Sequence, residues 1–573
     1  MNRRELIKLA LAGGAALAAG RVKLLADSSG STGDGGGQVV PGGNQLPESM
    51  SAPSPTTTPW VVEMPRMIVK QPKAIGPLGY QFLNGDFITP QNALSPTDAI
   101  QRSTHQYYNQ FYPVKWYELY EREAPHSWHP ELPIQPVWGF DGMFPGPLFI
   151  SKYGTPELLR IHNALPPTNA SIGFGLPSTS THGHNLHLAS ESDGFPCDFV
   201  NSGQYHDYHH PMCRPGFTLP TGEDPRETLG TLWYHDHRQD FTAQNTYAGL
   251  VGMRIAYDEL DTGDDSTGLH LPSGDYDVPI VFGDKAFDAN SGLLYFNLFD
   301  FDGMLGDKWT ANGVVQPYFR VEARRYRFRL LVAGPSRFWE FHLSDESPMC
   351  RISNDGNLFP YPVYQRGICL GVAERADVII DFSKYAPGTS VYLMNRLEQN
   401  NGRGPTGNLL NPGDPVIRFD VIPAASKDNS VMPTASTPLR AMPEVNLSEV
   451  VNQRVWRLDR SNGGWAINGL PFDVNRVSAH VKRNTAELWT LENNSGSWSH
   501  PMHIHFEEFQ ILTRNGVAPP PWERCRKDTV VLGPNESVTF FMRYRDFTGR
   551  YPMHCHNTVH EDHAMMIRWD LEA

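Results

Sequence analysis

The sequence predicts an all-β fold divided into three units. Turn-forming residues are frequent, with 51 Gly and 48 Pro in 573 residues. Apolar residues occur in short runs broken by turns, and long apolar runs of helical period are few. The chain is also longer than one hydrophobic core usually supports, so several domains are expected. Each unit would contain roughly 150 residues, an ordinary size for one core.

The first residues resemble a twin-arginine export signal, which we place at residues 1–26. Arg3 and Arg4 precede an apolar run rich in Ala and Gly that is too short and weak to span a membrane. We therefore expect a periplasmic or secreted protein without a membrane span. Residues 27–60 are rich in Gly, Ser, Pro and Thr and are expected to form a disordered linker.

The rest of the chain is expected to contain domains at residues 61–260, 261–425 and 446–573, with a linker at 426–445. Candidate strands of the first unit lie at 117–123, 136–149 and 157–166, and those of the second at 276–287, 326–334 and 375–383. The linker is polar and Pro-rich. The third unit begins with the strand-like run near residue 456.

Charge and cysteine content restrict the partners and the cross-links. The formal net charge is −14, which argues against nucleic acid or an anionic membrane as the main partner. Among six cysteines, Cys197 and Cys213 are close enough in sequence to pair in an exported protein. Buried free thiols are equally compatible with the sequence.

Four clusters of histidines carry the chemistry. Their members are His182 and His184; His235 and His237; His500, His503 and His505; and His554, Cys555, His556, His560 and Met565. Residues two apart on a strand share a face, so each His-x-His pair aims two imidazoles at one point. Neutral imidazole is a common metal ligand and suits copper. Another histidine-rich stretch, YHDYHH at residues 205–210, is expected to be a solvated loop.

The fourth cluster indicates an electron-transfer copper site. One thiolate, two imidazoles and a weak axial Met are typical of such a centre. Cys555, His560 and Met565 would supply three ligands, and His500 the second imidazole. Because the backbone joins Cys555 to His554 and His556, the strand would give a short electron path between two metal sites. Structural zinc, the alternative, favours several cysteines or a closed set of four ligands.

The four clusters, in this order, resemble the copper motifs of the three-domain multicopper oxidases. HPMHIH and HCHNTVHEDHAMM carry the resemblance, with GMFPGPLF and DGFP as flanking matches, over about residues 110–573. The similarity is greatest to the bacterial laccase, spore-coat and bilirubin-oxidase-like branch. It implies three cupredoxin-like Greek-key β-barrel or sandwich domains. Gly183 departs from the larger apolar residue usual between the first two histidines.

The resemblance also implies four copper ions and their ligands. The type 1 copper would be held by His500, Cys555, His560 and Met565, and the type 2 copper by His182 and His503. The two type 3 coppers would share His184, His235, His237, His505, His554 and His556. Asp193 and Glu561 match acids that deliver protons in the family. The simpler interpretation is that Asp193 caps a turn and Glu561 hydrogen-bonds a ligand histidine.

The implied activity is that of a laccase-like oxidase. It would couple four one-electron oxidations of a phenolic or aromatic-amine donor to reduction of O2 to two waters, as a monomer. One alternative is a metallo-oxidase acting on Fe(II), Mn(II) or Cu(I), although the 17 methionines are scattered rather than gathered in an insertion. Another is a copper-binding scaffold without activity, which the full ligand set disfavours.

Overall fold

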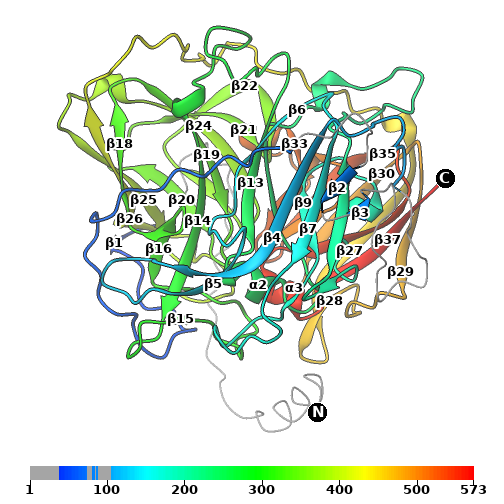
Figure 1. Ribbon diagram of the computed structural model, residues 1–573. Coiled ribbons are helices and arrows are strands. Elements are labelled where there is room, and N and C mark those ends of the chain that lie inside the picture. The colour runs from blue at the N-terminus through cyan, green and yellow to red at the C-terminus, as the bar shows by residue number, and fades with distance from the viewer. Residues whose placement is uncertain (1–37, 74–80, 84–85, 88–104) are drawn as a thin grey trace.

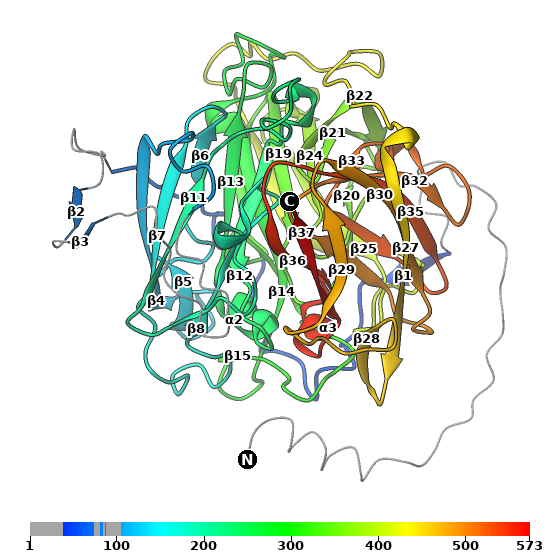
Figure 2. The same cartoon turned by 90° about the vertical axis from the view of Figure 1, so that its right-hand side faces the viewer.

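The computed structural model describes residues 38–73, 81–83, 86–87 and 105–573. Strands dominate it, and the described residues contain two α-helices, α2 (Thr242–Ala248) and α3 (Thr558–Asp562). No helix among these residues is both long and apolar enough to cross a membrane. The expected export signal, residues 1–26, lies outside the described part. The all-β prediction is confirmed, and the strands fall into three groups (Figures 1 and 2).

The first group packs two four-stranded sheets against each other. One sheet has the order β11-β7-β4-β5 and contains β4 (Lys115–His126), β5 (Gln135–Phe140), β7 (Glu157–Asn163) and β11 (Tyr205–His210). The other has the order β6-β13-β12-β9 and contains β6 (Phe149–Lys152), β9 (Thr181–His184), β12 (Thr231–Asp236) and β13 (Val251–Tyr257). Leu119, Phe149 and Tyr234 fill the space between the sheets. Two short pairs accompany this group: β2 (Gln81–Leu83) with β3 (Asp86–Phe87), and β8 (Ser178–Thr179) with β10 (Val200–Asn201).

The second group also consists of two sheets. The larger contains β14 (Asp277–Phe287), β15 (Leu294–Tyr295), β16 (Lys308–Ala311), β17 (Val314–Val315), β19 (Arg325–Val332), β21 (Met349–Asn354), β22 (Asn357–Gln365) and β24 (Arg375–Asp381). The smaller contains β1 (Val39–Gly42), β18 (Tyr318–Glu322), β20 (Trp339–Leu343), β23 (Ile368–Leu370), β25 (Ser390–Leu397) and β26 (Leu409–Ile422). Phe282, Trp339 and Phe419 belong to the core that they enclose.

The third group repeats this arrangement. One sheet contains β27 (Val450–Ser461), β28 (Gly464–Ile467), β30 (Thr485–Asn493), β32 (Phe509–Arg514), β33 (Arg526–Lys527) and β35 (Ser537–Tyr544). The other contains β29 (Val477–Lys482), β31 (His500–Ile504), β34 (Thr529–Leu532), β36 (Gly549–Cys555) and β37 (Met566–Glu572). Trp489, Phe540 and Trp569 are buried between them. Each group thus has the two-sheet form of a cupredoxin-like domain.

The first and third groups meet near the two α-helices. Figures 1 and 2 both show α2 next to α3, and the Ala243 N–H donates to Asp562 Oδ2 at 3.1 Å. The contact continues where His184 Nε2 lies 3.1 Å from Asp528 Oδ1. Histidine motifs from opposite ends of the sequence are therefore brought to one interface.

Two expectations differ from the structure. Residues 38–60, within the expected disordered linker, include β1, which pairs in parallel with β26 from Val39↔Leu409 onward. Asn44 reinforces this contact, because its Nδ2 donates to Asp414 Oδ2 at 2.8 Å. The expected solvated loop at residues 205–210 is the buried strand β11. There His209 Nε2 donates to the Phe111 carbonyl at 2.7 Å, so polar rings are buried with partners.

The cysteines are not cross-linked. All six lie in the described part as free thiols, Cys197 and Cys213 among them, and both of these are buried. The possible Cys197–Cys213 disulfide is therefore not formed in the structure.

Candidate metal centre

Strand pairing places the histidines of each half opposite one another. In the first group, β9 pairs with β12 so that His182 lies across from His235. In the third, β31 pairs with β36 so that His503 lies across from His554. The interface between the groups then joins the two sets.

Eight imidazoles form one buried cluster, the eight-histidine centre. Its ring nitrogens gather in three sets whose atoms lie within 4.8 Å of one another: His184, His235 and His556; His237, His505 and His554; and His182, His184 and His503. The first two sets divide the six predicted type 3 ligands into two triplets, and the third contains both predicted type 2 ligands. All eight side chains are buried.

Backbone carbonyls fix the orientation of several of these rings. His182 Nδ1 donates to the Asp193 carbonyl, His235 Nδ1 to the Asp236 carbonyl at 2.8 Å, and His503 Nδ1 to the Asp528 carbonyl at 2.9 Å. In each ring Nε2 is then buried without a partner among the described residues. A buried nitrogen lone pair without a donor is costly unless a cation occupies the space in front of it.

Ring nitrogens that face one another also indicate a space for a cation. His505 Nε2 lies 3.1 Å from His237 Nε2 and 3.2 Å from His554 Nε2. Burial lowers the pKa of His237 to about 4 and that of His505 well below its usual value, so these rings are neutral. Neutral imidazoles that converge in a dry site are the form that binds metal ions. The residues present therefore fit bound copper.

The two predicted acids lie directly behind rings of the eight-histidine centre. Asp193 Oδ2 is 2.7 Å from His505 Nδ1, and burial raises the pKa of Asp193 well above its usual value. Glu561 reaches two rings, with Oε1 2.9 Å from His237 Nδ1 and Oε2 3.0 Å from His554 Nδ1. Burial raises the pKa of Glu561, but the two imidazoles outweigh this effect and hold it well below the usual value. Both carboxylates can therefore orient the histidines in front of them.

A second, smaller cluster contains three of the four predicted type 1 ligands, His500, Cys555 and His560. Cys555 Sγ lies 3.4 Å from His500 Nδ1 and 3.6 Å from His560 Nδ1. Burial raises the pKa of the Cys555 thiol well above its usual value, so a bound cation is needed to hold the thiolate form. Met565 is fully buried, and its backbone is hydrogen-bonded to Cys555 and His560 at 3.0 Å. The cluster thus unites a thiol and two imidazoles, with the backbone of Met565 bonded to two of the three residues.

The end of β36 connects the two clusters. His554 and His556 reach the eight-histidine centre, whereas Cys555 between them reaches His500 and His560. This is the alternation that an extended strand imposes. Gly183 fits its place because a Cβ there would lie 3.1 Å from Leu186 Cδ1 and 3.2 Å from Leu188 Cδ1. The histidines on either side of it, His182 and His184, both lie in the eight-histidine centre.

Three residues of the site are not predicted from the sequence. Asp528 is fully buried and forms an ion pair with Arg375 at 2.7 Å, and its Oδ1 lies 3.1 Å from His184 Nε2. Ser495 Oγ is 2.7 Å from His500 Nε2, and the Asp302 carbonyl is 2.8 Å from His560 Nε2. No motif in the sequence around them marks these residues, so only the fold reveals them.

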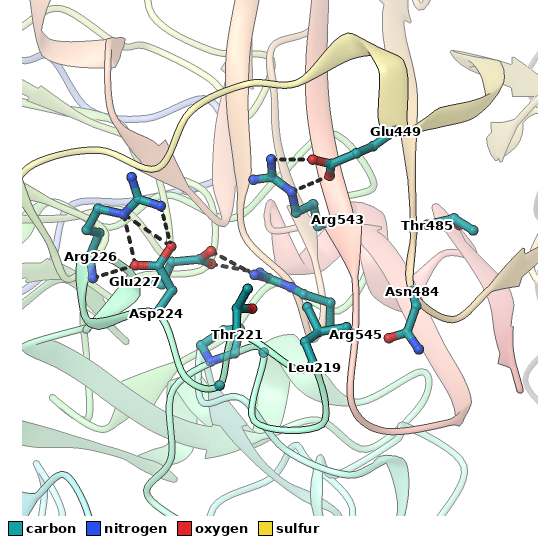
Figure 3. A pocket seen from close by; sticks show the side chains of 13 residues that line it. Leu219, Thr221, Asp224, Arg226, Glu227, Glu449, Asn484, Thr485, Arg543 and Arg545 are labelled. Carbon is teal, nitrogen blue, oxygen red and sulfur yellow. Dashed lines mark hydrogen bonds and ion pairs between the residues drawn. The ribbon is translucent and has the colours of Figure 1, made fainter.

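A cavity of about 320 Å³ lies elsewhere, between the first and third groups (Figure 3). It is lined by ion pairs, including Arg545 with Glu227 at 2.7 Å and Arg543 with Glu449 at 2.6 Å. Its charged side chains are Asp224, Glu227 and Glu449 against Arg226, Arg543 and Arg545, so their charges cancel. None of the predicted site residues lines it. We therefore assign the chemistry to the histidine clusters.

Comparisons with known proteins agree with this geometry. Two family models, both described as "Multicopper oxidase", match residues 125–261 and 444–572. A bilirubin oxidase from Albifimbria verrucaria is 33% identical over 474 residues, which cover 80% of this chain and 76% of that protein. A laccase from Bacillus subtilis (strain 168) is 30% identical over 511 residues, which cover 80% of this chain and 94% of that protein.

The fold is similar to solved structures as well. A crystal structure of a laccase from Pediococcus acidilactici superposes with a TM-score of 0.71 at 23% identity, covering 93% of this chain and all of that one. The extent of the sequence match to the bilirubin oxidase and the laccase decides the family. This chain belongs to the multicopper oxidases, the oxidoreductases that carry four copper ions and use O2 as electron acceptor.

Proposed function

We propose that the chain is a laccase-like oxidase of phenols or aromatic amines that reduces O2 to two waters. The observation that carries this proposal is the junction of two buried clusters by three consecutive residues, His554 to His556. Relatives named bilirubin oxidase and laccase support an organic aromatic donor.

The chain and the metal have separate tasks. Copper bound at the two clusters supplies the one-electron redox chemistry and the site for O2. Cys555 and its neighbours give a covalent route of a few bonds between the clusters. The complete burial of both centres excludes bulk water from the ligand atoms. The carbonyls behind His182, His235 and His503 hold the rings in position before any ligand binds.

Asp193 and Glu561 are proposed to deliver the protons that water formation requires. Both carboxylates are buried and lie against imidazoles of the eight-histidine centre. The Thr242 hydroxyl donates to Glu561 Oε1 at 2.6 Å and so connects this acid with α2. Asp193, whose pKa is raised, can hold a proton, whereas Glu561, whose pKa is lowered, can accept a proton and pass it on to the centre.

Oxygen uptake by purified, copper-loaded protein tests the function. The donors to compare are a methoxyphenol, bilirubin, Fe(II), Mn(II) and Cu(I). We expect turnover with the organic donors and a thiolate-to-copper absorption band that bleaches when donor is added without O2. Turnover with metal ions alone would identify a metallo-oxidase instead, and no turnover with any donor would overturn the proposal.

We further propose that the protein is exported by the twin-arginine route to the periplasm or the medium and acts as a monomer. The paired arginines Arg3 and Arg4 support the route. Replacing both by Lys should leave the protein in the cytoplasm of a twin-arginine-competent host. Size-exclusion chromatography with light scattering should give the mass of one chain, and a larger mass would contradict the monomer.

A further inference from the structure

Both imidazoles of the type 1 cluster are closed to an incoming donor. His500 and His560 are fully buried, and their Nδ1 atoms face Cys555 Sγ. The remaining nitrogens are also engaged. His560 Nε2 donates to the Asp302 carbonyl at 2.8 Å, and His500 Nε2 lies 2.7 Å from Ser495 Oγ. No ring nitrogen is left to hydrogen-bond a donor molecule.

The cover over this cluster is tightly packed. A Cβ at Gly402 would lie 2.3 Å from the Gly303 nitrogen, so two loop backbones are in direct contact. Asn557 Nδ2 donates to the Asp302 carbonyl at 3.2 Å and to the Gly402 carbonyl at 3.3 Å. Opening a path to His560 would break these contacts. Electrons must therefore enter through the groups that form the cover.

Two tryptophans lead from His560 to the surface. The Trp465 ring is buried, with its centroid 3.9 Å from that of His560. The Trp498 ring centroid lies 5.5 Å from that of Trp465, and Trp498 is a partly exposed residue. Trp465 is held in place because its indole N–H donates to the Phe301 carbonyl at 2.9 Å. The ring contacts thus continue from a type 1 ligand to solvent.

Two arginines flank the outer tryptophan. The guanidinium carbons of Arg403 and Arg460 lie 5.0 Å and 4.8 Å from the Trp498 ring centroid. Their side chains are 48% and 31% exposed. Asp302 lies 3.1 Å from Arg403 and 3.9 Å from Arg460, so these three side chains carry one net positive charge. This is a local positive site on a chain with a net charge of −14.

We propose that Arg403, Trp498 and Arg460, the arginine–tryptophan surface, dock the electron donor and select planar aromatic donors that carry a carboxylate or sulfonate. The inference rests on the proposed oxidase function and names the donor class for it. The donor ring stacks on Trp498 while its anionic group meets the guanidinium groups. The donor loses one electron and the type 1 centre gains it, with Trp465 between them and no bond formed.

Binding is tested with a redox-inert probe. Naphthalene disulfonate is titrated into copper-loaded protein by isothermal calorimetry at low and high salt. Arg403→Gln/Arg460→Gln should raise the Kd about tenfold and remove most of the salt dependence. Arg457→Gln is the matched control, because Arg457 is on the same strand as Arg460 and pairs with Glu492 at 3.3 Å. Equal Kd values in all three proteins would overturn the inference.

Kinetics with a matched pair of donors complete the test. The pair is a methoxyphenol and its sulfonated derivative. The double arginine variant should raise KM about tenfold for the sulfonated donor. It should leave KM for the neutral donor and the thiolate-to-copper absorption unchanged. Equal changes for both donors would contradict the selection of anions. If no donor is oxidised although the disulfonate binds as expected, the oxidase proposal fails and the binding surface stands.

Discussion

Cys555 shows how one residue serves two centres. Its side chain points to His500 and His560, and the backbone on either side carries two histidines of the eight-histidine centre. Strand alternation makes this arrangement possible without any special geometry. A helix at this point would turn each side chain about 100° from its predecessor and would not separate them onto two opposite faces.

Glu561→Gln tests the second predicted acid. The amide keeps the shape of a side chain that reaches His237 Nδ1 and His554 Nδ1 at 2.9 and 3.0 Å. The amide cannot accept a proton and pass it on as the carboxylate does. We expect full copper content and an unchanged thiolate-to-copper band, with oxygen uptake slowed about 100-fold. Copper analysis, absorption spectra and oxygen uptake measure the three quantities.

The neighbouring Asp562→Asn is the control for that variant. Asp562 Oδ2 accepts from the Ala243 N–H at 3.1 Å, and an asparagine oxygen can keep this contact. Its oxygen uptake should be close to that of the parent protein. If Glu561→Gln turns over at the full rate, the proton role of Glu561 is refuted.

Met565→Leu tests the axial position of the type 1 centre. A sulfur ligand generally gives a lower potential than an apolar residue there. The side chain is fully buried, so leucine of similar volume should be accommodated. We expect a blue protein with a higher type 1 potential. A redox titration that gives an equal or lower value would exclude Met565 as an axial ligand.

Residues that depend on long-range contacts could not be predicted. The histidine motifs can be recognised in the sequence because their members are only a few residues apart. Asp528, by contrast, meets His184 across a separation of 344 residues. The Asp302 carbonyl that covers His560 is a backbone atom, and no side-chain pattern marks it. The histidines and the cysteine that the structure gathers were therefore predictable, whereas the groups that orient and cover them were not.

At the scale of elements, the strand patterns predicted the sheets but not their burial. Residues 205–210 contain three histidines and an aspartate, and their polarity indicated a loop. The structure buries them because Arg160 pairs with Asp207 at 2.7 Å and other chain segments satisfy the rings. β1 was missed for a related reason. Its short sequence lies in a Gly-rich region and becomes a strand only through pairing with β26.

Lys285 on β14 gives a pH-dependent prediction at this scale. Its ammonium lies beneath α2, where Nζ donates to the Tyr247 carbonyl at 2.7 Å. Burial lowers the pKa of Lys285 to about 7. Between that pH and the ordinary lysine pKa, the unfolded chain binds more protons than the folded one. The free energy of unfolding should therefore rise with pH, by up to about 1.4 kcal/mol per unit.

Lys285→Met removes this contribution. We expect the unfolding midpoint of the parent protein in urea to increase, relative to that of the variant, from pH 7.5 to pH 9. Below the folded-state pKa of Lys285, the difference between the unfolding midpoints of the two proteins should not change with pH. If the unfolding midpoints of the two proteins change in parallel above that pKa, Lys285 is not deprotonated in the folded protein.

At the scale of the whole molecule, the copper clusters depend on contacts between the first and third groups of sheets. Buried ion pairs hold this interface. Glu227 from the first group meets Arg545 at 2.7 Å and Arg526 at 2.9 Å, and both arginines belong to the third. Arg526 also pairs with Glu508, three residues after His505. The network therefore lies close in sequence to His505 of the eight-histidine centre.

Two arginines of the same cavity provide a matched test of this network (Figure 3). Arg545 pairs with the buried Glu227 and Glu507, whereas Arg543 pairs with the more exposed Glu449. Arg545→Met takes the ion-pair partner from the buried Glu507 and leaves the buried Glu227 with Arg526 alone, which should cost about 3–5 kcal/mol. Arg543→Met should cost at most about 1 kcal/mol, because water can solvate Glu449. Urea unfolding of the copper-free proteins measures both. If both variants lose the same free energy of unfolding, the Glu227–Arg545 contact does not hold the first group against the third.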